Sequence, residues 1–212
     1  MAQYVSSLQT HYDMPSIPAK DSYKSYEGLT LRGIAAHIIN SVQLYKVEEI
    51  GTRNDCQLAI NFLIRMYHVR LTFMSRLPMP MSNAARLASG EKLIKEHAIP
   101  VATIMKLLID SEIPKTRLPI EQVLDRVMKL LDATTCRALV TKEEDARLTA
   151  ANLADRMPEG FSYPWADPWV RYKKAGIEID GLEEYTQAFA EAAAAAHAAE
   201  EALRAGKDTS RS

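Results

Sequence analysis

The stretch between Asp55 and Glu91 contains no acidic residue, and its basic side chains are the strongest candidates for binding an anion. Guanidinium groups can bind two phosphate oxygens at once, in a nucleic-acid backbone or in a small ligand. On a helix that turns about 100° per residue, four of the side chains share one stripe, whereas Arg70 lies off it and Arg86 follows later. The stripe consists of Arg65, His68, Thr72 and Arg76.

Phosphate binding is one of three interpretations of this stripe. The arginines could instead pair with acidic side chains of the same protein or of a neighbouring subunit, because residues 141–212 hold an excess of acidic residues. A charged helix face can also be a solvated surface with no partner. The formal net charge of −1 excludes a uniformly basic nucleic-acid binder, but it leaves room for a local basic patch.

Residues 91–131 have the pattern of three short helices with tight breaks between them. Pro100 and Pro119 suit the first turn of the second and third helices, because a proline there has no amide hydrogen bond to lose. Apolar residues follow each proline at helical spacing, which gives each helix one apolar face. A helix, a three-residue turn and a second amphipathic helix form the layout of a helix-turn-helix. The apolar positions are Val101, Ile104, Met105 and Leu108, then Ile120, Val123, Leu124 and Val127.

This segment resembles the second half of an excisionase-type winged helix-turn-helix. Ala98 stands at the turn, Thr103 and Ile104 form the Thr-Ile pair of the recognition helix, and residues 111–114 form its exit. The resemblance covers only this part of the chain. It implies an all-helical segment whose recognition helix spans Val101–Asp110, and it implies DNA contacts from Thr103, Lys106, Lys115 and Arg117.

Composition sets the outer limits on function. With 212 residues, 47% of them hydrophobic, the chain can bury a substantial core. Two isolated cysteines, Cys56 and Cys136, favour a reducing intracellular compartment, most simply the cytoplasm. The first residues lack the pattern of a signal peptide, and no run of apolar residues is long enough to span a membrane.

The sequence contains none of the common catalytic motifs, so we expect a protein that is not an enzyme and that needs no cofactor. The acidic residues Glu143, Glu144 and Asp145 could suggest a metal site. They stand at the expected first turn of a helix, where the helix dipole favours negative charge. We therefore expect no metal site and no small-molecule substrate.

The periodicities predict an all-α fold of about seven helices, arranged as an irregular bundle. Residues 1–28 are expected to form an extended arm whose tyrosines, Tyr12 among them, pack on their own domain or reach a neighbouring subunit. The predicted parts are that arm, an N-terminal helical subdomain (29–80), a central helical subdomain (82–157), an irregular strap (158–181), a C-terminal helix (182–206) and a disordered tail (207–212).

The strap contains both tryptophans of the chain, Trp165 and Trp169, together with Tyr172. Two indole rings carry too much apolar area to leave in water, so we expect both to be buried. They can pack on the helices of their own chain or in a contact between subunits. Stacking on nucleobases is a third alternative, because basic residues follow directly.

Two functions fit these observations. The first is a structural or assembly subunit of a homo-oligomer or larger complex, which can be organised around nucleic acid in the manner of a nucleocapsid. The second is a DNA-binding helix-turn-helix regulator. The first accounts for more of the chain, because the resemblance to a helix-turn-helix concerns only the middle.

Overall fold

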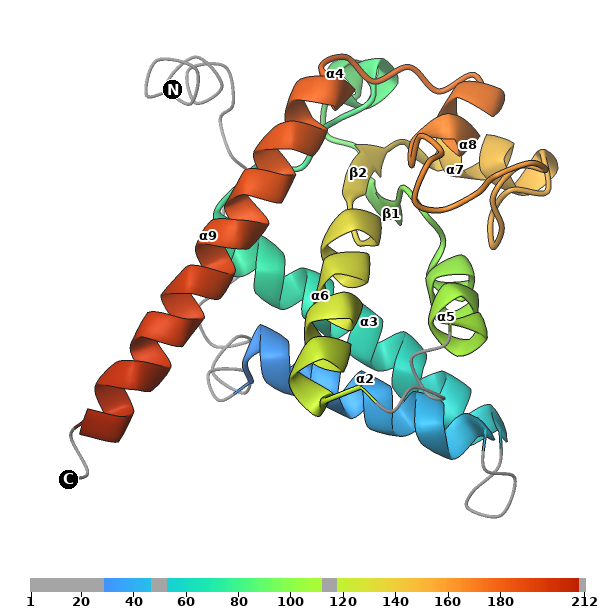
Figure 1. Ribbon diagram of the computed structural model, residues 1–212. Helices are drawn as coiled ribbons and strands as arrows, with labels where there is room; N and C mark the ends of the chain where they lie inside the picture. The colour runs from blue at the N-terminus through green and yellow to red at the C-terminus, as the bar shows by residue number, and fades with distance from the viewer. Residues whose placement is uncertain (1–28, 47–52, 112–117, 210–212) are drawn as a thin grey trace.

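The computed structural model describes residues 29–46, 53–111 and 118–209, and it confirms the predicted mostly α-helical fold (Figure 1). The described residues form eight helices and one small sheet. In chain order these are α2 (Leu31–Lys46), α3 (Arg53–Ser75), α4 (Asn83–Leu87), β1 (Ile94–His97), α5 (Val101–Asp110), α6 (Ile120–Thr134), β2 (Arg137–Val140), α7 (Lys142–Ala150), α8 (Val170–Lys174) and α9 (Leu182–Thr209).

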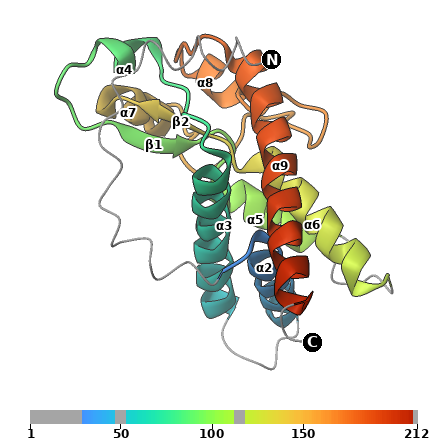
Figure 2. The same cartoon turned by 90° about the vertical axis from the view of Figure 1, so that its left-hand side faces the viewer.

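The elements form two groups that share one continuous hydrophobic core. Helices α2, α3, α5 and α6 make up one group, and the short elements α4, β1, β2, α7 and α8 make up the other (Figures 1 and 2). Helix α9 runs along both and contacts α3 and α6. The core extends from Leu31 to Ala196, so it crosses the boundary that the prolines near residue 80 suggest in the sequence.

The long helices bury the faces that their periodicity predicts. In α2, Ile34, Ile38 and Val42 are buried, and in α3 Ile60 and Tyr67 are buried. Thr30 caps α2, since its Oγ1 accepts a hydrogen bond from the amide of Gly33 at 2.9 Å. Burial of these apolar faces supplies most of the stability of the helices, because isolated helices are only marginally stable in water.

The helix predicted at residues 91–97 is wrong, because Ile94–His97 forms strand β1. It pairs with β2 in antiparallel register, with Ile94 opposite Val140 and His97 opposite Arg137. Main-chain pairing with a distant strand outweighs the weak helical preference of four residues. The pairing places β1 directly before α5, so the predicted first helix of the helix-turn-helix is a strand in this structure.

Side chains cap the beginnings of two helices. Ser82 caps α4, and Thr141 and Glu144 form a capping box at the start of α7. The buried Glu144 carboxylate also accepts a hydrogen bond from the hydroxyl of Ser82 at 2.5 Å. One carboxylate therefore joins the beginnings of two helices, which explains the acidic character at residue 144 without a metal ion.

Helix α7 ends at Ala150, because a turn follows in which Asn152 has a positive φ of 57°. Two predictions for the C-terminal part are wrong. The strap, predicted to be irregular, contains helix α8. Helix α9 continues through Gly206 to Thr209, which includes three residues of the predicted disordered tail.

No helix among the described residues is long and apolar enough to cross a membrane.

Candidate functional site: a cationic cluster between α3 and the small sheet

The predicted basic stripe on α3 is not one continuous surface. Arg65 is exposed, but the imidazole of His68 is buried and Thr72 is half-buried beside it. The Thr72 hydroxyl lies 3.0 Å from Nε2 of His68. Arg76 stands after the end of α3, where its φ of 54° turns the chain away from the helix. The stripe is interrupted because α3 packs its His68 side against the sheet.

The side chain of His68 on α3 lies beside a group of charged and polar side chains on β1, β2 and α8. Its ring meets the ring of His97 edge to face, with 5.5 Å between centroids. The Nε of Arg137 donates a hydrogen bond to Nε2 of His97 at 2.9 Å. Because Nε2 accepts this bond, the neutral ring carries its proton on Nδ1. Residues 97 and 137 can meet because they stand opposite each other in the sheet.

Arg171 of α8 is completely buried and is the centre of the remaining contacts. Its guanidinium pairs with the carboxylate of Glu96 on β1. It also donates to the carbonyl oxygens of His97 at 2.5 Å and of Leu153 at 2.6 Å. The hydroxyl of Tyr172 donates to the carbonyl oxygen of Glu96 at 3.1 Å. These bonds tie α8 and the turn after α7 to the end of β1.

Burial and positive charge determine the protonation states in this cluster. Burial lowers the pKa of His97 and of His68 well below the ordinary value, and the charge of Arg137 lowers each further. Both rings are therefore neutral near pH 7. Burial also raises the pKa of Glu96, although the neighbouring Arg171 opposes that shift. The pKa of Arg137 is lowered to about 10, first by burial and then by the charge of Arg65, so Arg137 remains charged.

Sequence reasoning selected Arg65 and His68 but missed Glu96, His97, Arg137 and Arg171 as members of the same cluster. The missed residues come from three elements that only the tertiary fold brings together. Burial alternates along Arg137–Val140, as in a half-buried strand, but only the folded chain shows this alternation. In sequence the segment is one arginine followed by three apolar residues, which does not specify a pairing with β1.

Arg70 shows the intramolecular pairing that was one alternative for the basic residues of α3. Its Nε lies 3.2 Å from Oε1 of Glu200 on α9, and both side chains are largely buried. The other oxygen of Glu200 accepts a hydrogen bond from the amide of Leu31 at 2.7 Å. Beside this pair, the carboxylate of Asp132 accepts from the Tyr67 hydroxyl at 2.7 Å and lies 2.9 Å from Nε2 of His197. The acidic and polar residues of the C-terminal helix thus hold α9 against α3 and α6.

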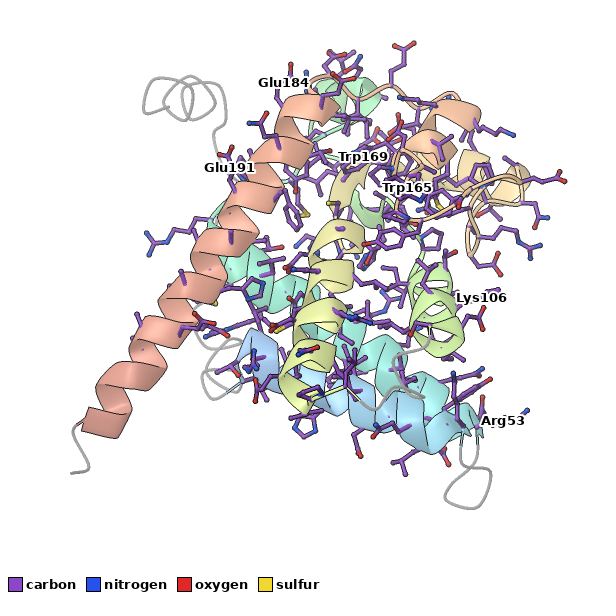
Figure 3. All side chains as sticks on the ribbon, in the orientation of Figure 1. Arg53, Lys106, Trp165, Trp169, Glu184 and Glu191 are labelled. Atoms are coloured by element: carbon purple, nitrogen blue, oxygen red, sulfur yellow. The ribbon has the colours of Figure 1, made fainter. Side chains whose placement is uncertain are left out.

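The remaining predicted anion-binding residues lie elsewhere. Arg86 is 3.4 Å from the carboxylate of Asp180, so it also has an acidic partner. Lys106 pairs with Asp110 on the outward side of α5, and Thr103 is half-buried on the same helix (Figure 3). The predicted positions Lys115 and Arg117 lie outside the described residues, as does the predicted interface residue Tyr12.

The two tryptophans of the strap have opposite environments (Figure 3). Trp169 is buried, as predicted, with an exposed fraction of 2%, and its indole nitrogen donates to Thr186 at 2.9 Å. Tyr172 stacks on it and is also buried, so neither residue is at the surface for a partner. Of the two predicted ways to bury Trp165, packing on its own chain is wrong, since its side chain is 89% exposed, and burial in a contact between subunits stays a prediction. It lies on a turn that precedes α8 and leaves the indole ring without a covering helix.

A shallow hollow of about 290 Å³ lies between the end of α7 and α8. It is lined by both apolar and charged side chains, with Arg156, Glu159 and Lys174 among them. Within the described part of the chain, no three His, Cys, Asp or Glu side chains are arranged to hold a metal ion.

No protein-family model matches this chain, and neither does any curated protein or solved structure.

Proposed function

We propose that this protein is a non-enzymatic assembly subunit that docks against other protein subunits in a homo-oligomer or a larger complex. The observation that carries the proposal is the 89% exposure of Trp165. Tryptophan is the side chain most enriched among the anchors of protein interfaces, where burial of its large apolar ring contributes strongly to binding. A partner surface that buried the exposed ring of Trp165 would gain this contribution.

A second exposed apolar surface lies on α3 and supports the same role. Leu58 and Phe62 are 65% and 57% exposed. They stand four residues apart, so they are neighbours on one helix face. Single exposed apolar side chains are common on any protein surface, but adjacent large ones are typical of contact sites.

The test is the mass of the purified protein, measured by light scattering with and without nuclease treatment. We expect an assembly larger than one chain, and we expect Trp165→Ala and the double variant Leu58→Gln/Phe62→Gln to shift it towards the monomer. Leu87→Ala, a change at an equally exposed leucine outside both surfaces, is the matched control. A wild-type protein that stays monomeric at every concentration, with or without nucleic acid, would contradict the proposal.

The nuclease treatment separates two forms of the assembly. Loss of the assembly on treatment indicates subunits organised around nucleic acid, whereas an assembly that survives is held by protein contacts alone.

The DNA-binding regulator is the second candidate, and one observation favours it. Helix α5 spans Val101–Asp110, the residues of the expected recognition helix, and it packs on α6. The ion pair of Lys106 with Asp110 reduces the basic charge that α5 presents. A dimer that binds one duplex sequence, with weaker binding by Lys106→Gln at every sequence tested, would support this alternative over the assembly subunit.

A further inference from the structure

Helix α3 has apolar side chains on two opposite faces. Ile60 and Tyr67 belong to the face that is buried in the core. On the opposite face, Leu58, Phe62 and Phe73 are each more than half exposed. A helix that is apolar all round is normally covered on all sides. The outer face of α3 therefore has the composition of a contact surface.

Helix α6 provides a comparison, because it lies at the opposite edge of the same group of helices (Figure 2). It buries Val123 and Val127 on its inner face and exposes Asp125, Arg126 and Lys129 on its outer face. Charged side chains are well hydrated in water, whereas exposed phenylalanine rings gain free energy when they leave it. The outer face of α3 thus differs from a solvated helix face of the same protein.

The apolar residues on the outer face of α3 form one stripe along the helix. At about 100° per residue, its members fall within about 60° of one another. The stripe spans about four turns, which is long enough for a second helix to lie along it. This α3 stripe consists of Leu58, Phe62, Val69 and Phe73, of which Val69 is half-buried.

The α3 stripe has the same spacing in both directions from its midpoint. With a rise of about 1.5 Å per residue, Phe62 and Val69 each lie about 5 Å from the midpoint, and Leu58 and Phe73 lie about 11 Å from it. A second copy of α3, laid antiparallel on the first, therefore places Phe62 opposite Val69. The same operation places Leu58 opposite Phe73, and each contact occurs twice. A two-fold interface requires a self-complementary patch of this kind.

Charges of opposite sign stand at the two ends of the stripe. Asp55 lies in the first turn of α3, Arg76 lies directly after its last turn, and both are exposed. Arg76 keeps its place on the helix, because its amide donates to the carbonyl oxygen of Thr72 at 3.1 Å. Each charge lies about 16 Å from the midpoint, so an antiparallel pair brings Asp55 of one copy to Arg76 of the other. A parallel pair would bring like charges together.

The area of the α3 stripe suits the centre of a small interface. Large apolar side chains bury about 150–250 Å² each, so the exposed parts of Leu58, Phe62 and Phe73 amount to roughly 350 Å² per copy. An interface of standard size buries about 800 Å² per partner. Exposed polar residues beside the stripe, Asn54 and Arg76 among them, can form the polar rim that commonly surrounds an apolar centre.

We propose that α3 pairs with α3 of a second copy of this chain, antiparallel and about a two-fold axis at the midpoint of the α3 stripe. The inference rests on the proposed assembly role and names the partner of its α3 surface. The apolar composition, the symmetric spacing and the opposite charges at the two ends all agree with this partner. A partner of different sequence would require neither the symmetric spacing nor the opposite charges.

Arg65 lies near the two-fold axis but at the edge of the α3 stripe. Its Nε donates at 2.9 Å to Oδ1 of Asn61, which lies about 90° around the helix from the centre of the stripe. This bond holds the guanidinium away from the apolar centre. The Arg65 side chains of two copies approach each other in solvent, where water and salt screen their repulsion. Removal of this charge should therefore strengthen the dimer.

The experiment locates the two-fold axis by crosslinking the full-length protein with a short reagent that joins two thiols. Arg65→Cys places one thiol of each copy at the axis, so this variant should crosslink to itself. Leu58→Cys alone and Phe73→Cys alone should not crosslink, because the two equivalent positions stand about 22 Å apart along the helix pair. A mixture of those two variants, after exchange of subunits, should crosslink.

The background of this experiment is low, because the natural cysteines Cys56 and Cys136 are buried. Wild type and Leu87→Cys, which places a thiol at an exposed position on α4, are the controls and should not crosslink. Trp165→Ala should leave the crosslink of Arg65→Cys in place.

Sedimentation measures the dissociation constant of the dimer in two variants that should act in opposite directions. Phe62→Ala should raise it about tenfold or more, because a central aromatic contact is lost. Arg65→Gln should lower it about two- to fivefold, because two like charges near the axis are removed. A variant that fails to fold cannot tighten a dimer, so Arg65→Gln tests the contact independently of any loss of fold. Leu87→Ala is the control with no expected change.

An assembly that forms without a crosslink in Arg65→Cys would overturn this contact and leave the assembly proposal in place. An unchanged dissociation constant in both Phe62→Ala and Arg65→Gln would have the same meaning. Crosslinks confined to single chains would show that another part of the same chain covers the α3 stripe, and they would also overturn the contact. A wild-type protein that is monomeric at every concentration would instead contradict the assembly proposal itself.

Discussion

Arg65 and Arg70 stand five residues apart on α3, yet among the described residues only Arg70 forms an ion pair. Arg70 meets Glu200 from α9 and is largely buried in that pair. Arg65 is exposed, and its Nε donates a hydrogen bond to the amide oxygen of Asn61 on the same helix. The difference shows that the neighbours of a charged side chain on a helix determine whether its charge is paired. Arg70 contributes to attachment within the chain, whereas Arg65 forms no ion pair with any residue that the structure describes.

The two regions also differ in how their charges are balanced. Where α9 attaches to the other helices, Glu200 and Asp132 each accept hydrogen bonds from groups on other helices. Arg70 and Glu200 bring charges of opposite sign together there. At the cationic cluster, the buried Arg171 has one carboxylate and several carbonyl oxygens, while Arg137 has only an imidazole. We expect mutations in the first region to weaken the attachment of α9, and mutations in the second to weaken the attachment of α8 to β1.

Replacing Arg171 should have the largest effect on stability. Arg171→Gln leaves the Glu96 carboxylate and two buried carbonyl oxygens without their donor, so we expect a loss of about 3–5 kcal/mol in the free energy of unfolding in urea. Arg156→Gln is the matched control, because that exposed side chain pairs only with the adjacent Asp155, and it should change stability by less than about 0.5 kcal/mol. Similar small losses for both variants would show that the buried network contributes little.

The second largest effect on stability should come from lowering the pH. The pKa values of His68 and His97 are lowered in the folded protein, so below about pH 6.5 the unfolded chain binds protons that the folded chain does not, and stability falls with falling pH. Each ring should contribute a loss of roughly 2 kcal/mol between pH 6.5 and pH 5. Urea unfolding at several pH values measures this slope.

His197 should act in the opposite direction. Although burial alone would lower its pKa, the hydrogen bond to Asp132 and the charge of Asp132 raise it overall. A raised pKa adds stability that is complete below the unfolded value and is lost as the pH rises through the folded one. The variant His197→Gln should therefore lose stability more steeply on acidification than wild type. NMR titration should show His197 protonating above pH 6.5 while His68 and His97 stay neutral at pH 5.

Breaking the pair of Arg70 with Glu200 should have a smaller effect, of about 1–3 kcal/mol, because one hydrogen-bonded charge remains largely buried without its partner. A double-mutant cycle with Arg70→Gln and Glu200→Gln measures the coupling between them. The same cycle on Lys106 and Asp110, an exposed pair on α5, should give no more than about 0.5 kcal/mol. Equal couplings would remove the distinction between a buried and an exposed pair.

The smallest effect is expected for Arg65→Gln, whose stability should stay within about 0.5 kcal/mol of wild type or rise slightly, since the change removes repulsion from Arg137. The pKa of Arg137 should move up towards its ordinary value in that variant, which nitrogen-detected NMR can follow. A clear loss of stability would mean that Arg65 has a structural role, and the contrast with Arg70 would disappear.

Local patterns in the sequence predict most of the helices and several of their ends. The apolar spacing in α2, α3, α5 and α6 is strong, and the caps at Ser82 and Thr141 depend only on residues within one turn. Strand β1 is missed because its four residues take their conformation from β2, and His97 and Arg137 are separated by 40 positions.

The cluster could be predicted only in part for the same reason. A helical wheel places Arg65 and His68 on one stripe, but it cannot show that the sheet packs against His68 and buries it. It places Arg70 off that stripe, but it cannot show that Arg70 pairs with Glu200, because that partner lies 130 residues away. The environments of Trp165 and Trp169 likewise depend on α9, because Thr186 of that helix binds Trp169 and no residue there covers Trp165.

The hydrogen bond from the amide of Leu31 to Glu200 spans 169 positions of sequence. It means that the first turn of α2, which Thr30 also caps, receives a second acceptor from α9. During translation, α2 and α3 leave the ribosome long before Glu200 is synthesised, so the amide of Leu31 and the guanidinium of Arg70 lack this partner until α9 arrives. Helix α9 thus completes α2, and a nascent chain arrested before α9 should remain a client for chaperones.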